Sequence, residues 1–167
     1  MASTYSTSLR LELMATGDQS GTWGDTTNTN LGTLLEQAIT GVLSVAQGDA
    51  ELTLTALDGA SDQSRNAVVN LTGAMTSAQN VIVPDANKLY LIKNSTTGGF
   101  SVTVKTASGT GVAVPPGSSR WVYADGTNVV NGLTGNQAAN AFLAGYTTTA
   151  TAAGTTTLTV ASTQTQY

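Results

Sequence analysis

Cysteine and histidine are both absent from the 167 residues of this chain. Without cysteine there are no disulfides and no thiolate metal sites, and without histidine the commonest metal ligand and general base is missing. A serine nucleophile would also lack its usual base, and no Gly-x-Ser-x-Gly elbow occurs. We therefore expect a protein that is not an enzyme, with no catalytic residue, no cofactor and no metal.

Charge is scarce as well. Charged residues make up 10% of the chain, against about a quarter in ordinary globular domains, and the net charge is -4. The basic residues are scattered singly, so there is no basic stripe to neutralise phosphates, and we expect no nucleic-acid partner. No apolar stretch approaches the roughly 18 residues that a bilayer requires, so we expect no membrane insertion.

Threonine and glycine are abundant where charged residues are scarce. Covering a surface of hydroxyls and small side chains costs little desolvation free energy, whereas each unpaired ion taken from water costs several kcal/mol. The composition therefore favours a subunit that buries much of itself against copies or neighbours. A solvated, threonine-rich β domain is the alternative interpretation.

The N-terminal part of the sequence predicts a strand followed by a helix. Leu9, Leu11 and Leu13 alternate with polar residues, which is typical of a strand with one buried face. A glycine-containing loop follows, and Asn28 or Asn30 stands where a helix cap is needed.

Apolar residues then recur at i, i+3, i+4, i+7 and i+8, the pattern of an amphipathic helix with one buried face. The members of this pattern are Leu31, Leu34, Leu35, Ala38, Ile39, Val42 and Leu43. Core packing is the default interpretation of such a stripe, and packing against equivalent helices around a symmetry axis is the other. Gly41 lies within the pattern, so the helix has an alternative end there, with a strand beginning at Val42.

Short strand patterns separated by turn residues follow from Glu51 onward, and they predict a mainly β fold with an N-terminal helix. The seven predicted strands are Leu52 to Ala56, Ala67 to Leu71, Val81 to Val83, Leu89 to Lys93, Phe100 to Lys105, Val112 to Val114 and Arg120 to Ala124. We expect neighbouring strands to pair antiparallel, as a meander in a β-sandwich or jelly-roll-like domain.

The C-terminal part has a weaker pattern. Residues 136–146 predict a short helix, and residues 147–157 predict an extended or mobile neck because threonine, alanine and glycine bury little apolar area. Thr157 to Val160 resembles the start of another β module. We therefore expect three parts: an anchoring segment (1–48), a β-sandwich domain (49–131), and a helix, neck and further β module (132–167).

Three phrases of the sequence resemble the N-terminal portion of bacteriophage tail fibre proteins, over a span from about Tyr5 to Asn131. They are Gly21 to Leu31, with its tryptophan between glycines, Leu54 to Asp62, and Leu91 to Phe100. The resemblance implies a virion protein that docks onto the tail or baseplate for host attachment, and three parallel copies of the chain. The candidate anchoring and assembly contacts are Trp23, Leu31, Leu34, Leu35, Ala38, Ile39 and Val42. The distal part of a longer chain would then meet the host surface receptor.

Two other functions stay open at this point. A head fibre or capsid decoration protein shares the composition and the symmetry. A carbohydrate-binding module would use Tyr90, Trp121 and Tyr123 on one face of a sandwich. A calcium loop at Asp58 and Asp62 is disfavoured, because the alternating oxygen ligands and the closing glutamate of such loops are missing, and we expect a turn with solvated carboxylates there instead.

Overall fold

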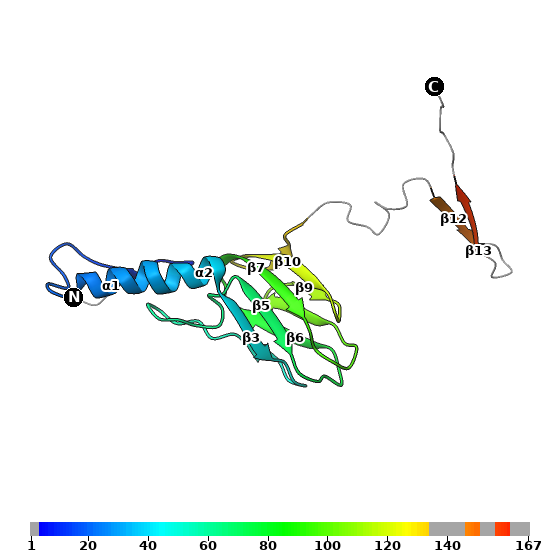
Figure 1. The fold of residues 1–167 in the computed structure, drawn as a ribbon, viewed down its shortest axis with the longest axis horizontal. Helices are drawn as coiled ribbons and strands as arrows, with labels where there is room; N and C mark the ends of the chain where they lie inside the picture. The colour runs from blue at the N-terminus through cyan, green and yellow to red at the C-terminus, as the bar shows by residue number, and fades with distance from the viewer. Residues whose placement is uncertain (1–3, 134–145, 151–155, 161–167) are drawn as a thin grey trace, which may run out of the picture. The chain divides into compact units, whose positions relative to one another are not determined.

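The computed structural model describes residues 4–133, 146–150 and 156–160, and the chain divides into two compact units, Met1–Leu133 and Thr134–Tyr167. The protein is mainly β, with several sheets and one helix of 18 residues (Figure 1). The mainly β expectation is thus confirmed. No helix in the described ranges is both long and apolar enough to cross a membrane.

The helix is continuous through α1 (Trp23–Asn28), η1 (Thr29–Leu35) and α2 (Glu36–Thr40). Its middle segment is π-helical, a wider turn that is rare and often found at functional sites. The expected start was wrong, because Trp23 already lies in the first turn and neither Asn28 nor Asn30 caps the helix. Asn30 instead bonds to the backbone of Glu12.

The helix ends at Gly41, whose backbone is extended with φ -61 and ψ 136. A Cβ at this position would overlap the carbonyl oxygen of Gln37 and the side chain of Asn66. Val42 and Leu43 therefore belong to strand β3 (Val42–Ala46) and not to the helix. The prediction that the helix continues through these two residues was wrong, and the alternative end at Gly41 is confirmed.

The predicted strand over residues 9–13 forms only at its C-terminal end. Only Glu12–Leu13 is a strand (β2), paired antiparallel with Thr4–Tyr5 (β1). Arg10 takes a positive φ of 51°, and its N–H donates to the Ser6 carbonyl at 2.8 Å. This turn breaks the alternation of the leucines, because one left-handed residue redirects the side chains that follow.

Nine further strands, including β3, form two sheets that share one core. The five-stranded sheet has the order β11-β10-β7-β5-β3, and the four-stranded sheet has the order β4-β6-β8-β9. The remaining strands are β4 (Leu52–Thr53), β5 (Val68–Thr72), β6 (Gln79–Val83), β7 (Asn87–Asn94), β8 (Val102–Thr106), β9 (Gly111–Val114), β10 (Ser119–Asp125) and β11 (Val129–Asn131). All seven predicted strands are present, and β11 is an addition.

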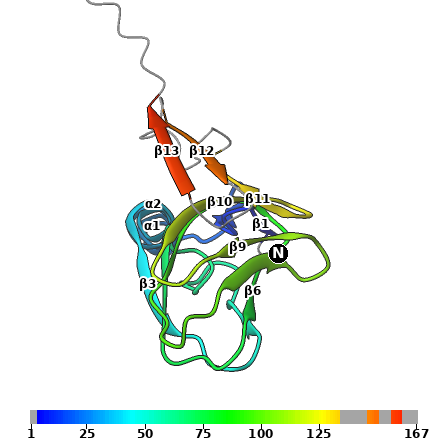
Figure 2. The ribbon, with the colours of Figure 1, turned by 90° about the vertical axis from the view of Figure 1, so that its right-hand side faces the viewer.

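The expected antiparallel meander is wrong for most of the domain. The chain alternates between the sheets from β3 to β8, so that β3, β5 and β7 run parallel in one sheet and β4, β6 and β8 run parallel in the other (Figures 1 and 2). Only β9, β10 and β11 join by antiparallel pairing. Alternation predicts a strand but carries no information about the direction of its neighbour.

The core lies between the inner faces of the two sheets. Valine, leucine and isoleucine side chains fill it, and Tyr90 and Met75 are its largest members that are not aliphatic. The buried cluster is Leu54, Val69, Leu71, Met75, Val81, Val83, Tyr90, Ile92, Val102, Val104, Val114, Val122, Ala124 and Val129. Burial of these side chains at about 1.5–3 kcal/mol each is the main stabilising contribution in this unit.

The C-terminal unit contains an antiparallel pair, β12 (Tyr146–Ala150) and β13 (Thr156–Val160). Part of the expected neck is therefore a strand. The expected strand at Thr157 to Val160 is present, paired within the chain. The predicted helix over 136–146 lies outside the described residues, apart from its last position in β12.

Candidate assembly surface

The structure separates the seven candidate contact residues into a buried and an exposed group. Leu34 is fully buried, and Leu35 and Ala38 are half-buried. Four others are exposed: Trp23 by 62%, Leu31 by 57%, Ile39 by 66% and Val42 by 67%. The sequence pattern indicated one continuous apolar face, whereas the molecule buries some of these side chains and exposes the others.

The buried side of the helix holds the N-terminal segment and the loop before β5. Asn30 donates from Nδ2 to the Glu12 carbonyl at 2.8 Å and accepts from the Glu12 N–H at 3.1 Å. Gln37 donates from Nε2 to the Asp62 carbonyl at 3.0 Å. Leu34 is four residues after Asn30 and three before Gln37, so it lies on this same side.

Three exposed apolar side chains of the helix, Trp23, Leu31 and Ile39, recur every eight residues, and we call them the helix stripe. Each has more than half of its surface in water. Single exposed apolar residues are ordinary, but an aromatic and two aliphatic side chains exposed along one helix make this helix the candidate contact surface.

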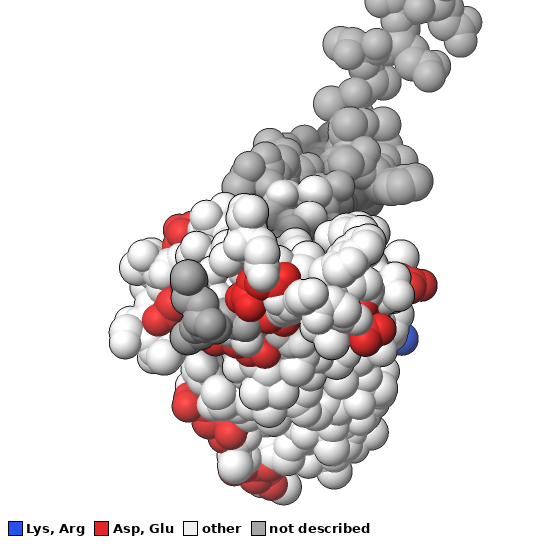
Figure 3. All heavy atoms as spheres, turned by 90° about the vertical axis from the view of Figure 1, so that its left-hand side faces the viewer, with Lys and Arg blue, Asp and Glu red and all other residues white. Residues whose placement is uncertain are grey.

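The helix stripe lies in an acidic environment. Residues 4–40, which we call the helical arm, contain four acidic residues, Glu12, Asp18, Asp25 and Glu36, and one basic residue, Arg10. Figure 3 shows acidic atoms scattered over the face at this end, with basic atoms only at its margin. The helical arm thus combines apolar contacts with a net negative charge.

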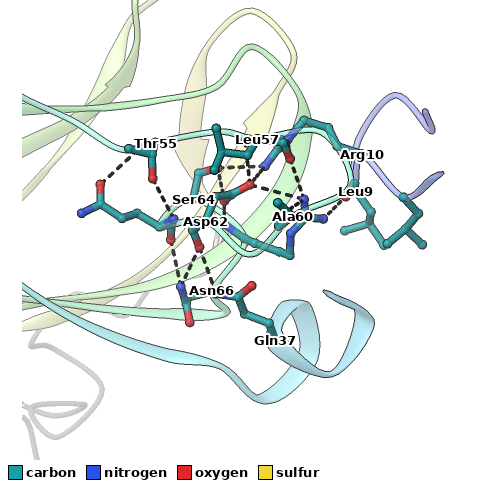
Figure 4. Close-up of polar contacts among 12 residues, drawn as sticks. Leu9, Arg10, Gln37, Thr55, Leu57, Ala60, Asp62, Ser64 and Asn66 are labelled. Atoms are coloured by element: carbon teal, nitrogen blue, oxygen red, sulfur yellow. Dashed lines mark hydrogen bonds and ion pairs between the residues drawn. The ribbon is translucent and has the colours of Figure 1, made fainter. Parts of the chain in front are cut away.

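The helical arm is fixed to the β domain by a buried carboxylate. The side chain of Asp62 is fully buried, and its Oδ2 lies 2.7 Å from Arg10 Nη2 and 3.3 Å from Arg65 Nη2. Oδ1 accepts from the Ser64 hydroxyl at 3.0 Å and from the Arg65 N–H at 2.7 Å, and Oδ2 also accepts from the Leu57 N–H at 2.9 Å (Figure 4). We call Arg10, Asp62, Ser64 and Arg65 the Asp62 anchor.

The second arginine of the Asp62 anchor also reaches the N-terminal segment. Arg65 donates from Nη1 to the Leu9 carbonyl and from Nη2 to the carbonyls of Leu57 and Ala60. Both Asp62 oxygens are therefore occupied by protein donors, and the carboxylate holds two arginines in place of a cation.

Burial works to raise the pKa of Asp62, but hydrogen bonds from the Leu57 N–H and from Arg10, with the charge of Arg10, outweigh it and hold the pKa below its usual range. A carboxyl group with a lowered pKa stabilises the fold above its unfolded pKa of about 4, and this contribution disappears as the pH falls through the lower folded value.

We therefore expect the stability difference between the wild type and Asp62→Asn to be largest near pH 7 and to shrink below about pH 4. Urea unfolding of both proteins at a series of pH values measures it. A difference that stays constant down to pH 2.5 would contradict the role of the ionised carboxylate.

The aromatic trio considered for sugar binding does not share a face. Tyr90 lies in the core, with Lys88 Nζ 4.9 Å from its ring centroid, and burial, together with Arg10 and Arg65, lowers the pKa of Lys88 to about 8. Trp121 and Tyr123 lie on the opposite, outer side of the five-stranded sheet, 40% and 37% exposed. Tyr90 cannot line a surface with them.

The outer side of the five-stranded sheet carries an apolar band that sequence reasoning missed. In the sheet register Val42 is opposite Val68, Val68 is opposite Leu91, and Leu91 is opposite Trp121. A second row joins Leu89 to Tyr123 and Tyr123 to Val130. We call these seven residues the apolar band; five of them are exposed and two, Val68 and Leu91, are half-buried.

The outer side of the four-stranded sheet is different. Its register rows contain Thr53, Asn80, Thr103, Lys105 and Ala113, with Ile82 as a buried exception. A sheet face exposed to water normally carries polar residues of this kind. The contrast within one molecule shows that the apolar band is not a general property of this composition.

Within the described ranges, no group of three or more acidic, histidine or cysteine side chains is placed to hold a metal ion. Comparisons with protein-family models, with curated proteins and with solved structures find no match to this chain. The helical arm, the Asp62 anchor and the apolar band are therefore the features of the described residues that bear on function.

Proposed function

We propose that this chain is a structural virion protein, the N-terminal part of a bacteriophage tail fibre that anchors the fibre to the tail or baseplate during host attachment. The proposal rests on one observation: a helical arm that carries an exposed apolar stripe in acidic surroundings and is fixed to a β domain. It needs no catalytic residue.

The arm suits anchoring because it is held in place before it meets a partner. The bonds from Asn30 and Gln37 hold the buried side of the helix, and the Asp62 anchor holds the segment before it, so little conformational entropy is lost on docking. Trp23 is the strongest candidate contact, since buried tryptophans dominate interface energies. The partner surface would offer an apolar groove with basic residues around it, complementary to the acidic arm.

The proposal includes two finer statements about architecture. The two sheets form a β-sandwich that acts as a rigid body behind the arm, and three chains associate in parallel as a homotrimer. The low charge supports association, because surfaces without ions can be covered at small desolvation cost.

Two other functions would use the same molecule differently. A head fibre or capsid decoration protein would dock the same helix stripe on the shell. A carbohydrate-binding module would use Trp121 and Tyr123, which remain two residues apart on an exposed face. The helix stripe favours docking, since a sugar-binding module has no use for it.

Locating the chain on assembled particles tests the proposal. An epitope tag on the C-terminal end, detected by gold labelling in electron micrographs of the phage, is expected to mark the tail or baseplate. Labels on the capsid would support the head-fibre alternative. Particles without any label, made from a genome that expresses the tagged chain, would contradict a virion role.

Replacing Trp23 with alanine is expected to weaken the docking affinity by about 30-fold or more, as for a hot-spot residue. The incorporation of the chain into particles should fall as a result. The stability of the isolated chain should change little, because Trp23 is 62% exposed. Quantitative immunoblotting of purified particles measures incorporation. Thr29→Ala, at another exposed helix position, is the control. Equal incorporation of both variants would remove Trp23 from the docking surface.

A further inference from the structure

We propose that copies of this chain meet through the apolar band on the outer side of the five-stranded sheet, while the helix stripe is left for the tail partner. This inference rests on the homotrimer of the proposed function and names the surface that forms it. The occupant of the band is a second copy of the same chain.

The band is continuous across the sheet. The row from Val42 to Trp121 crosses β3, β5, β7 and β10, and the row from Leu89 to Val130 crosses β7, β10 and β11. Opposite side chains in neighbouring strands lie about 4.5–5.5 Å apart, so the seven side chains form one surface. No charged residue lies in either row.

The area of the band matches one side of an interface. From their exposed fractions, its residues present on the order of 500 Å² of apolar surface, at the upper end of what a typical monomer leaves exposed in one patch. A standard interface covers about 800 Å² per partner, of which about 60% is apolar. In a ring each copy divides the band between its two neighbours, so the band supplies the apolar centre of each contact and the polar residues around it supply the remaining area.

Charge decides between the band and the helix stripe as the contact between identical chains. Copies that meet through the helical arms would bring Glu12, Asp18, Asp25 and Glu36 of each chain together, with only one arginine per arm, and that arginine is already paired with Asp62. Like charges placed together at an interface cost several kcal/mol. The neutral band carries no such penalty, whereas the acidic arm suits a partner of the opposite charge.

Side-chain size changes across the band in a way that suits a ring of copies. At one side Val42 lies on β3, an edge strand without charge or proline. Towards the other side, on β10, are the aromatic rings of Trp121 and Tyr123, with Val130 of the edge strand β11 beyond Tyr123. In a trimer the contact is heterologous, so the aromatic side of one copy packs against the small-residue side of the next.

The test measures the mass of the full chain by analytical ultracentrifugation across a concentration series. Trp121→Glu and, separately, Val42→Glu are expected to weaken self-association by about 30-fold or more, because each places a charge in the buried contact. Thr103→Glu is the matched control on the outer side of the four-stranded sheet and is expected to keep the wild-type mass. Circular dichroism and urea unfolding show that each variant is folded.

Val42 is 67% exposed, so its variant remains informative if Trp121→Glu does not fold. An equimolar mixture of folded Trp121→Glu and Val42→Glu chains should regain part of the wild-type mass, because each retains the side that the other has lost. This recovery distinguishes a heterologous contact from a symmetric pair.

Each contrary outcome has a separate meaning. Folded band variants that keep the wild-type mass, or an Ile39→Glu variant that dissociates the copies, would overturn this inference and leave the homotrimer intact. A wild-type chain that is monomeric at high concentration would contradict the homotrimer itself. Band variants that keep their mass but lose binding to host-cell polysaccharide would identify the band as a sugar-binding face instead.

Discussion

Replacing Asp62 with asparagine is expected to lower the free energy of unfolding by about 3–5 kcal/mol at pH 7, the cost of removing one partner from a buried ion pair. The substitution leaves Arg65, which is almost fully buried, without its carboxylate and leaves Arg10 without its nearest anion. The amide group of asparagine also places an N–H donor where the carboxylate oxygen accepted hydrogen bonds, so that it faces other donors such as the Leu57 N–H. A domain of ordinary stability would lose a large part of its margin.

Urea unfolding followed by circular dichroism measures this loss. Asp58→Asn, four residues earlier in the same loop and exposed, removes an equal charge but no hydrogen bond of the Asp62 anchor, and it should shift the midpoint little. Hydrogen exchange should also become faster at the Leu11 and Arg10 amides, which lie in the turn that the anchor holds. Equal stabilities of the two variants would mean that the anchor contributes no net free energy.

Replacing Gly98 with alanine is expected to be comparably severe, by about 3 kcal/mol or more, because two penalties add. Gly98 has a φ of +105°, where a side chain strains the backbone. In addition, a Cβ there would overlap the carbonyl oxygen of Met75, which is a backbone atom and cannot move aside as the end of a flexible side chain can. The bridge between Ala74 and Thr97, which closes this loop on the sheet, would be displaced.

The neighbouring glycine separates the two penalties. Gly99 also has a positive φ, +82°, but a Cβ there would meet nothing within 4 Å. Gly99→Ala should therefore cost only the backbone strain, about 1–3 kcal/mol. Denaturant midpoints of the two variants give the comparison, and a Gly99→Ala variant as unstable as Gly98→Ala would show that the contact with Met75 adds nothing.

The positions of the strands were predictable because period-2 alternation is local. Patterns such as Val102 to Thr106 contain their own evidence for a strand. The direction of pairing was not predictable, because the partner of Val42 is Val68 and the partner of Leu52 is Val81, and nothing in the intervening sequence specifies a parallel crossover. Expecting neighbours in sequence to pair was the natural but wrong interpretation.

The candidate site was predictable only in part. The helix stripe was visible as periodic apolar residues, but the helix was expected to bury one face throughout, and the π-helical turn and the end at Gly41 changed which residues face outward. Asp62 resembled a solvated turn residue, because its partner Arg10 is 52 residues away. The apolar band was hidden for the same reason, since its members become neighbours only once the sheet register is known.

The alternation of the chain between two sheets also has a consequence for how the protein forms. Strand β3 can pair only after β5 has been synthesised, because its Val42 pairs with Val68, 26 residues further along the chain. In the same way β4 can pair only after β6 has been synthesised. Such a high contact order places folding in the slow class, milliseconds to seconds. During synthesis on the ribosome the edge of β3 therefore stays unpaired until β5 has emerged, and an unpaired strand edge of this kind is a site at which nascent chains can aggregate.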